Sequence, residues 1–114
     1  MRPEKLYLTD IVEAAQAIEN FVKGEDFNEF ERNEMMSSAV LQKLTVIGEA
    51  AAHLPKDFTK RFPEIPWLDI VGFRNIAVHE YFAIRLDIAW VAAMEEVPVL
   101  KKQIEKILQD EFQD

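Results

Sequence analysis

Apolar residues recur every three or four positions along most of the chain, which is the spacing of one face of an α-helix. The first stripe predicts a helix over roughly residues 4–23 and contains Leu8, Ile11, Ala15, Ile18 and Val22. Pro3 suits the start of this helix, and Gly24 suits the position just after its end. We interpret residues 25–32 as an acidic linker that Phe27 and Phe30 attach to the core.

The second stripe predicts a long helix that Pro55 ends, and it contains Met36, Val40, Leu44, Ile47, Ala51 and Leu54. The pattern of residues 56–62 predicts a short, turn-rich helix. Pro63 and Pro66 bracket the stiff link that follows. A third main helix is expected from about Pro66 to His79. The last stretch, residues 85–112, is again helical in pattern, and Pro98 is expected to kink or split it.

These elements predict an all-α fold, an up-and-down helical bundle of four to five helices. The 114 residues leave room for a single domain, residues 1–114, and no internal repeat is visible. A bundle of this size has a thin core, so dimerisation would help to stabilise it.

Composition excludes several other classes of protein. The longest uninterrupted apolar run is the seven residues from Ile88 to Met94, far short of the ~20 that cross a bilayer. Residues 1–5 do not open a signal peptide, so we expect a cytoplasmic protein with no membrane segment. The chain has no cysteine and two histidines without paired carboxylates at ligand spacing, which predicts no metal site and no cofactor.

The net charge of −8 argues against a general nucleic-acid coat protein, because phosphate neutralisation requires basic surface. The charge is uneven: residues 53–85 contain five basic and four acidic side chains, whereas the remainder contains eight and seventeen. An anionic ligand should therefore prefer the middle segment. The simpler alternative is that an acidic surface only keeps the protein dissolved.

The predicted third helix departs from the bundle pattern. Arg74 occupies a position where the apolar stripe calls for an aliphatic side chain. An arginine there must reach solvent, pair with an acid such as Glu49, or face a site that accepts anions. Gly72 inside a helix costs about 1 kcal/mol relative to alanine. Close approach of another helix, from the same chain or a partner, would explain it.

Asn75 and His79 are four residues apart and share one helical face. Arg74 and His79 are five apart, and their directions differ by about 140° on a regular helix. Two copies of the helix facing each other would bring these groups into one shared cleft, so the geometry favours a symmetric homodimer. The simpler alternatives are a structural histidine at a helix end and an arginine engaged in an ordinary ion pair.

Residues 74–82 read R-x4-H-x-Y, with Arg74, His79 and Tyr81 at the fixed positions. This run resembles the signature of the HEPN superfamily, and specifically the HepT-like toxins of HEPN–MNT toxin–antitoxin pairs. The similarity extends over most of the chain: Asp10-Ile11 in the first helix, residues 46–50 (VIGEA) and residues 62–67 (FPEIPW) also resemble that family.

The resemblance implies a HEPN-type bundle, a homodimer with both motifs at its interface, and metal-independent ribonuclease activity on RNA. It implies Arg74 and His79 as catalytic residues, with Asn75 in a supporting role. It also implies a small nucleotidyltransferase (MNT) antitoxin that transfers AMP to Tyr81. The chemistry suits these side chains, since histidine exchanges protons near neutral pH and the arginine fork matches phosphate oxygens.

Two other functions stay open at this point. The chain could be a non-catalytic dimeric HEPN module that binds a nucleotide or a nucleotidyltransferase. Separately, Tyr81 could be a packed aromatic residue in the connection of residues 80–84. The chain could also be a plain structural dimer, in which case Arg74→Leu should increase stability by replacing a costly cation. The acidity of the chain weighs against tight RNA binding, which would have to rely on a local basic cleft.

Overall fold

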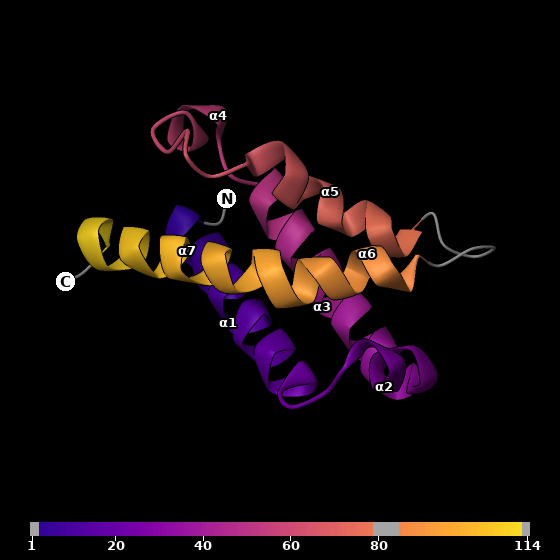
Figure 1. The fold of residues 1–114 in the computed structure, drawn as a ribbon. Coiled ribbons are helices and arrows are strands. Elements are labelled where there is room, and N and C mark those ends of the chain that lie inside the picture. The colour runs from indigo at the N-terminus through magenta and orange to yellow at the C-terminus, as the bar shows by residue number, and fades with distance from the viewer. Residues whose placement is uncertain (1–2, 79–84, 113–114) are drawn as a thin grey trace.

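The computed structural model describes residues 3–78 and 85–112, and within these ranges the chain is helical and contains no strand (Figure 1). The all-α prediction is confirmed. In chain order the elements are α1 (Glu4–Val22), α2 (Phe27–Arg32), α3 (Glu34–Ala52), α4 (Lys56–Thr59), α5 (Trp67–Val78), α6 (Leu86–Val91), a π-helical turn η1 (Ala92–Glu96) and α7 (Val97–Glu111).

The long helices pack as a bundle around one apolar core. α1 lies against both α3 and α7, and α5 packs on α3 (Figure 1). The core side chains come from the stripes that the sequence predicts: Leu8, Ile11 and Ile18 of α1 and Val40, Leu44 and Ile47 of α3 are inaccessible to solvent. Burial of a side chain of this size stabilises the fold by about 1.5–3 kcal/mol.

The ends of α1 match the prediction. Pro3 directly precedes the helix, and Gly24 follows it with a φ of 76°, a left-handed conformation that L side chains rarely adopt. The second long helix, α3, ends at Ala52, three residues before Pro55.

Residues 25–32 are not a linker, and the prediction for them is wrong. Residues 27–32 form α2, which a capping box opens: the Glu29 N–H donates to the Asp26 carboxylate, and the Asp26 N–H donates to the Glu29 carboxylate, both at 2.8 Å. The D-x-x-E spacing of these two residues is the sequence signal for that cap. The anchoring role of Phe30 is confirmed, because its ring is fully buried and lies 5.1 Å from that of Trp90.

Pro98 does not split the last helix. α6, η1 and α7 run on as one rod, which crosses in front of α1 and α3 in Figure 1. At η1 the Val97 N–H donates to the Ala92 carbonyl, five residues back rather than four. Proline has no N–H and crowds the preceding turn. The rod therefore changes its hydrogen-bond register immediately before Pro98, as π turns allow.

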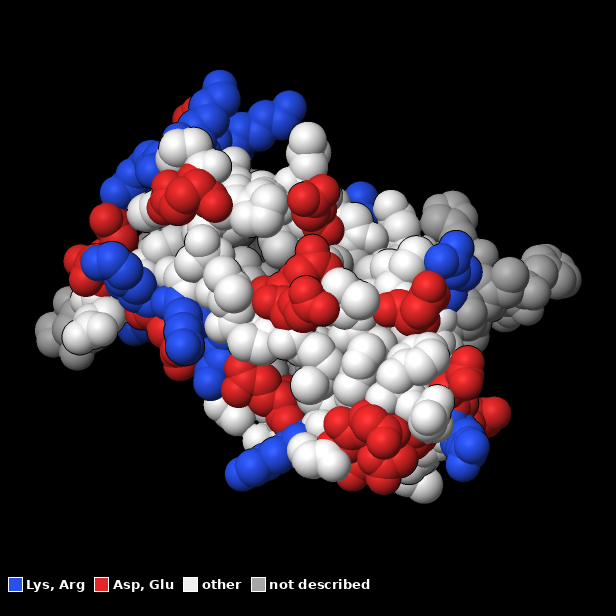
Figure 2. Space-filling model, viewed as in Figure 1, with Lys and Arg blue, Asp and Glu red and all other residues white. Residues whose placement is uncertain are grey.

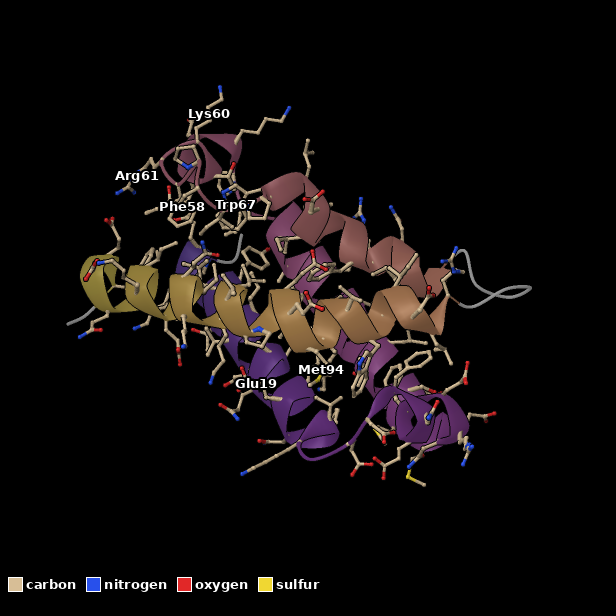
Figure 3. All side chains as sticks on the ribbon, viewed as in Figure 1. Glu19, Phe58, Lys60, Arg61, Trp67 and Met94 are labelled. Carbon is tan, nitrogen blue, oxygen red and sulfur yellow. The ribbon has the colours of Figure 1, made fainter. Side chains whose placement is uncertain are left out.

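Charged side chains are distributed unevenly over the surface. On the face shown in Figure 2, Lys and Arg gather over α4, where Lys60 and Arg61 project from the body (Figure 3), while carboxylates dominate the middle of the face. The basic excess of the middle segment therefore lies largely at α4, and Arg61 there already pairs with Glu111 at 2.6 Å. Within the described ranges, no helix is both long and apolar enough to cross a bilayer.

Candidate functional site

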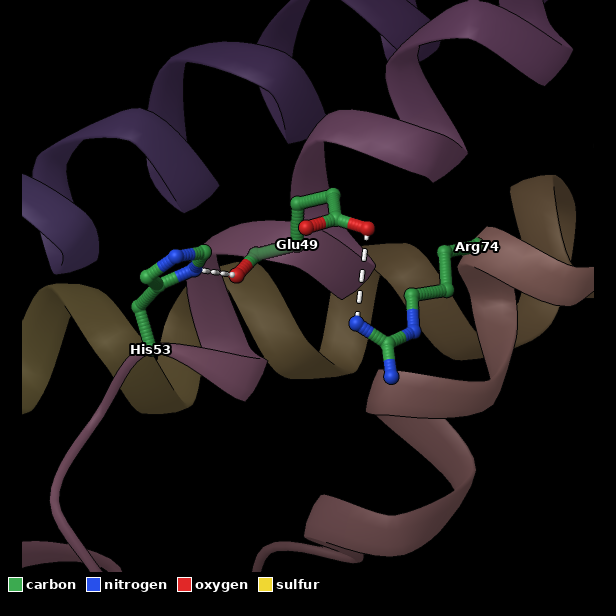
Figure 4. Close-up of polar contacts among 3 residues, drawn as sticks. All are labelled: Glu49, His53 and Arg74. Atoms are coloured by element: carbon green, nitrogen blue, oxygen red, sulfur yellow. Dashed lines mark hydrogen bonds and ion pairs between the residues drawn. The ribbon is translucent and has the colours of Figure 1, made fainter.

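Arg74 lies on the side of α5 that faces α3. Its Nη1 is 3.4 Å from Oε1 of Glu49 on α3 (Figure 4), so Glu49 is the acidic partner that the sequence suggested. The two side chains remain 39% and 51% exposed, respectively. The guanidinium therefore reaches solvent along the helix surface, and it is not a cation enclosed in the core. An ion pair this exposed contributes little to stability.

Gly48 explains why Arg74 can lie so close to α3. A Cβ built at Gly48 would come within 2.6 Å of the Arg74 backbone nitrogen and 2.9 Å of the Val71 carbonyl oxygen, closer than real Cβ atoms approach. Only glycine admits the backbone of α5 at this point. Because Glu49 is the next residue, the turn of α3 that admits α5 also presents a carboxylate to the arginine.

The close helix approach was predicted at Gly72, and within the chain that prediction is wrong. A Cβ built at Gly72 meets no described atom within 4 Å, since this residue lies on the outward side of α5. The second helix approaches at Gly48 instead, a residue that the sequence pattern did not distinguish from other small core residues.

Asn75 lies on that same outward side. With Leu68, which is 89% exposed, and Gly72, it forms what we call the outer face of α5. The structure brings Arg74 and Asn75 to neighbouring sides of one helix. His79 and Tyr81 lie outside the described residues, so their predicted convergence with Arg74 stays a prediction.

A groove between α3 and α1 adjoins the Arg74–Glu49 pair. Its volume is about 450 Å³, and Glu49 forms part of its wall. At one end the ring of His53 stacks on that of Tyr7, with centroids 5.4 Å apart and planes inclined by 22°. The His53 Nδ1–H donates to the Glu49 carbonyl at 2.7 Å (Figure 4), which holds the imidazole beside the groove.

The sequence pattern indicates His53 only as a possible metal ligand and does not distinguish Tyr7. The available signal was spacing: His53 follows Glu49 by four residues, and such residues share a helical face. In the part of the chain that the structure describes, no three His, Asp or Glu side chains cluster closely enough to hold a metal ion.

Comparisons with known proteins identify the family of the chain. The profile of the family described as "Ribonuclease HepT-like" matches residues 11–107. "Putative RNase MJ1380" of Methanocaldococcus jannaschii is 42% identical over 104 residues, covering 91% of this chain and 95% of that protein. "Probable ribonuclease HepT" of Thermococcus cleftensis is 37% identical over 106 residues, covering 93% and 96%. No solved structure matches at a significant level.

The matched range contains Gly48, Glu49 and Arg74 together with the R-x4-H-x-Y run. The resemblance that these motifs indicated is confirmed, and the chain belongs to the HepT-like ribonuclease family of the HEPN superfamily.

Proposed function

We propose that this protein is the toxin of a type II toxin–antitoxin pair of the HEPN/MNT kind: a metal-independent endoribonuclease with a composite site at a homodimer interface. Arg74 and His79 are its catalytic residues, and Asn75 supports them. The observation that carries the proposal is the placement of Arg74, whose half-exposed guanidinium is positioned by Gly48 and Glu49 beside an uncovered helix face. Relatives named as ribonucleases over nearly the whole chain add support.

The outer face of α5 supports the homodimer. Apolar side chains are distributed all around α5 and do not form one stripe, a pattern typical of helices covered on more than one side. α3 covers the side that carries Val71 and Arg74, and Ile70 and Phe73 are buried, whereas Leu68 on the outer face is almost fully exposed. A second copy of α5 against this face would bury Leu68 and bring both copies of Arg74 near one seam.

The proposed reaction needs no metal. One imidazole takes the proton of a ribose 2′-hydroxyl while its oxygen attacks the adjacent phosphorus. The bond from phosphorus to the 5′-oxygen breaks, and that oxygen receives a proton from the imidazole of the second subunit. The permanently charged Arg74 stabilises the negative charge that grows on the phosphoryl oxygens. Asn75 orients the substrate or His79.

Neutralisation by a nucleotidyltransferase antitoxin fits the same site. Transfer of AMP from ATP to the hydroxyl of Tyr81, with release of pyrophosphate, would attach a bulky anion two residues beyond His79 in the sequence. The added group blocks access of RNA and repels its phosphates.

The test is cleavage of RNA by the purified dimer in the presence of EDTA. Arg74→Ala and His79→Ala are each expected to lower the rate by about 100-fold or more, the usual contribution of a general acid–base or an oxyanion-stabilising group. Arg32→Ala, which removes an exposed arginine from α2, is the matched control and should leave the rate unchanged. Equal activity of all four proteins would exclude the catalytic assignment.

The acidic surface favours one alternative, a non-catalytic dimeric module that binds a nucleotide or a nucleotidyltransferase. This function predicts that RNA stays intact in the same assay. It also predicts that complex formation with a nucleotidyltransferase of the MNT type survives His79→Ala. Co-expression with that protein followed by intact-mass measurement detects AMP on Tyr81 under either function.

A further inference from the structure

A second groove runs along one side of α7, between that helix and residues 62–70. It consists of two adjoining hollows of about 280 and 260 Å³, and Glu64 and Gln103 line both of them. The lining extends along the rod from residue 95 to residue 111, about 24 Å at a rise of 1.5 Å per residue. This α7 groove is therefore long enough to hold a segment of polypeptide.

The floor of the α7 groove is apolar. Pro66 and Ile70 contribute one side of it, and Val99 and Leu100 contribute the other. Ile70 and Leu100 are buried, but Val99 is 56% exposed although it lies on the side of α7 that faces residues 64–70. Covering this surface with an apolar side chain of another molecule would be favourable, because it removes hydrocarbon from water.

The wall opposite α7 is fixed by hydrogen bonds within the chain. The Trp67 indole N–H donates to the Phe62 carbonyl at 3.0 Å, and the Trp67 amide donates to the Ile65 carbonyl at 2.8 Å. At the far end of the groove, Arg61 donates to the carboxylate of Glu111 at 2.6 Å and joins α4 to the end of α7. The groove is thus formed in advance, which lowers the entropy lost when a partner binds.

Unpaired carboxylates surround the larger hollow, on a face where acidic side chains predominate (Figure 2). Partial burial, together with the charges of Asp69 and Glu95, raises the pKa of Glu96, so these groups lie within reach of one another. Within the described ranges, neither they nor Glu64 take part in an ion pair. In those same ranges no carboxylates cluster tightly enough to hold a metal ion. A complementary ligand therefore carries several cations spread along its length.

We propose that the α7 groove binds a basic amphipathic helix of a partner protein. The apolar stripe of that helix covers Val99 and Pro66, and lysine or arginine side chains beside the stripe pair with the rim carboxylates. RNA does not fit this surface, because the same carboxylates repel its phosphates. The lining contains none of the predicted catalytic residues, so the proposal goes beyond the proposed ribonuclease function and does not depend on it.

A synthetic helical peptide tests the groove. The probe has about 16 residues to match its length, with leucines at helical spacing and lysines on both sides of them. Its dissociation constant for the full-length protein is measured by calorimetric titration. Glu64→Gln combined with Glu95→Gln should weaken binding about 5-fold or more, and Val99→Gln about 3-fold or more. Glu13→Gln combined with Glu31→Gln removes the same charge from exposed positions of α1 and α2 and is the matched control.

A second peptide, with alanine in place of leucine, keeps the charge and should bind at least about 10-fold more weakly. The proposal is overturned if the first peptide does not bind, if both peptides bind equally, or if the control variant loses as much affinity as the groove variant. It also fails if Val99→Gln changes only the self-association of the protein, or only its RNA binding. RNA cleavage by Val99→Gln at the wild-type rate would show that the groove acts apart from the proposed catalytic site.

Discussion

Gly48 of α3 packs directly against the backbone of Arg74 in α5: a Cβ built at residue 48 would lie 2.6 Å from the Arg74 amide nitrogen. The same residue pair therefore determines both the packing of α5 on α3 and the place of the guanidinium. A substitution at Gly48 therefore acts on the candidate site by shifting the backbone of α5, and it does not contact the Arg74 guanidinium.

Gly48→Ala is expected to destabilise the protein by about 1–3 kcal/mol, because the added methyl group meets rigid backbone that must shift. It should also lower RNA cleavage by displacing Arg74. Urea denaturation measures the free energy of unfolding, and the cleavage assay is run at a temperature where the variant is folded.

Gly72→Ala provides the control, since a Cβ there meets no described atom of the chain. In a helix interior this substitution should stabilise the monomer by about 0.5–1 kcal/mol. The free energy of unfolding should be measured at a protein concentration low enough to dissociate the proposed dimer. Equal destabilisation by the two alanines would show that the Gly48 contact is unimportant.

The sequence predicts the bundle well because its apolar stripes are regular, and the stripes of α1 and α3 are the buried ones. It also identifies Glu49 as the partner of Arg74. It misplaces the close helix approach because a glycine's neighbours depend on how two helices are rotated, which periodicity alone does not determine. The groove beside Glu49 was missed for a similar reason: Tyr7 and His53 are 46 positions apart and meet only in the folded chain.

Arg74→Leu should change the free energy of unfolding by less than about 1 kcal/mol, because the Arg74–Glu49 pair is half exposed. A structural dimer with a costly buried cation instead predicts a clear gain in stability. Thermal and urea unfolding of the variant, compared with wild type at one protein concentration, separate the two expectations.

Leu68→Glu should weaken the proposed homodimer by about 10-fold or more, because burial of a leucine side chain contributes about 1.5–3 kcal/mol and a carboxylate would oppose it. Met35→Glu is the matched control, since Met35 is 83% exposed at the start of α3. Sedimentation equilibrium gives both dissociation constants. The outer face of α5 is not the interface if the two variants dimerise equally well.

Glu96→Gln should stabilise the protein near neutral pH. Partial burial, together with the negative charges of Asp69 and Glu95, raises the pKa of Glu96 above its ordinary value of 4.5. The native state therefore holds this proton more tightly than the unfolded state. As pH increases from about 4.5 through the raised pKa, the free energy of unfolding falls.

In Glu96→Gln this pH-dependent decrease in the free energy of unfolding should disappear. Because the carboxylate is largely exposed, solvent limits the gain at pH 7 to about 0.5 kcal/mol. Thermal unfolding between pH 4 and pH 7 provides the measurement, with Glu105→Gln on the exposed side of α7 as the control. Parallel pH profiles for wild type and Glu96→Gln would contradict the assignment to this residue.

The π turn at residues 92–96 has a consequence for how this rod tolerates changes in length. On one side of it Trp90 packs against Phe30 of α2, and on the other Leu100 and Ile104 pack in the core. One residue corresponds to about 100° of helical rotation. A turn closed by an i→i+5 bond absorbs one extra residue without adding that rotation. Deleting a single residue within the turn would therefore restore a regular α-helix and leave Trp90 and Leu100 at nearly their present relative angle. The widened turn thus lets the rod carry one additional residue while both of its ends keep their packing partners.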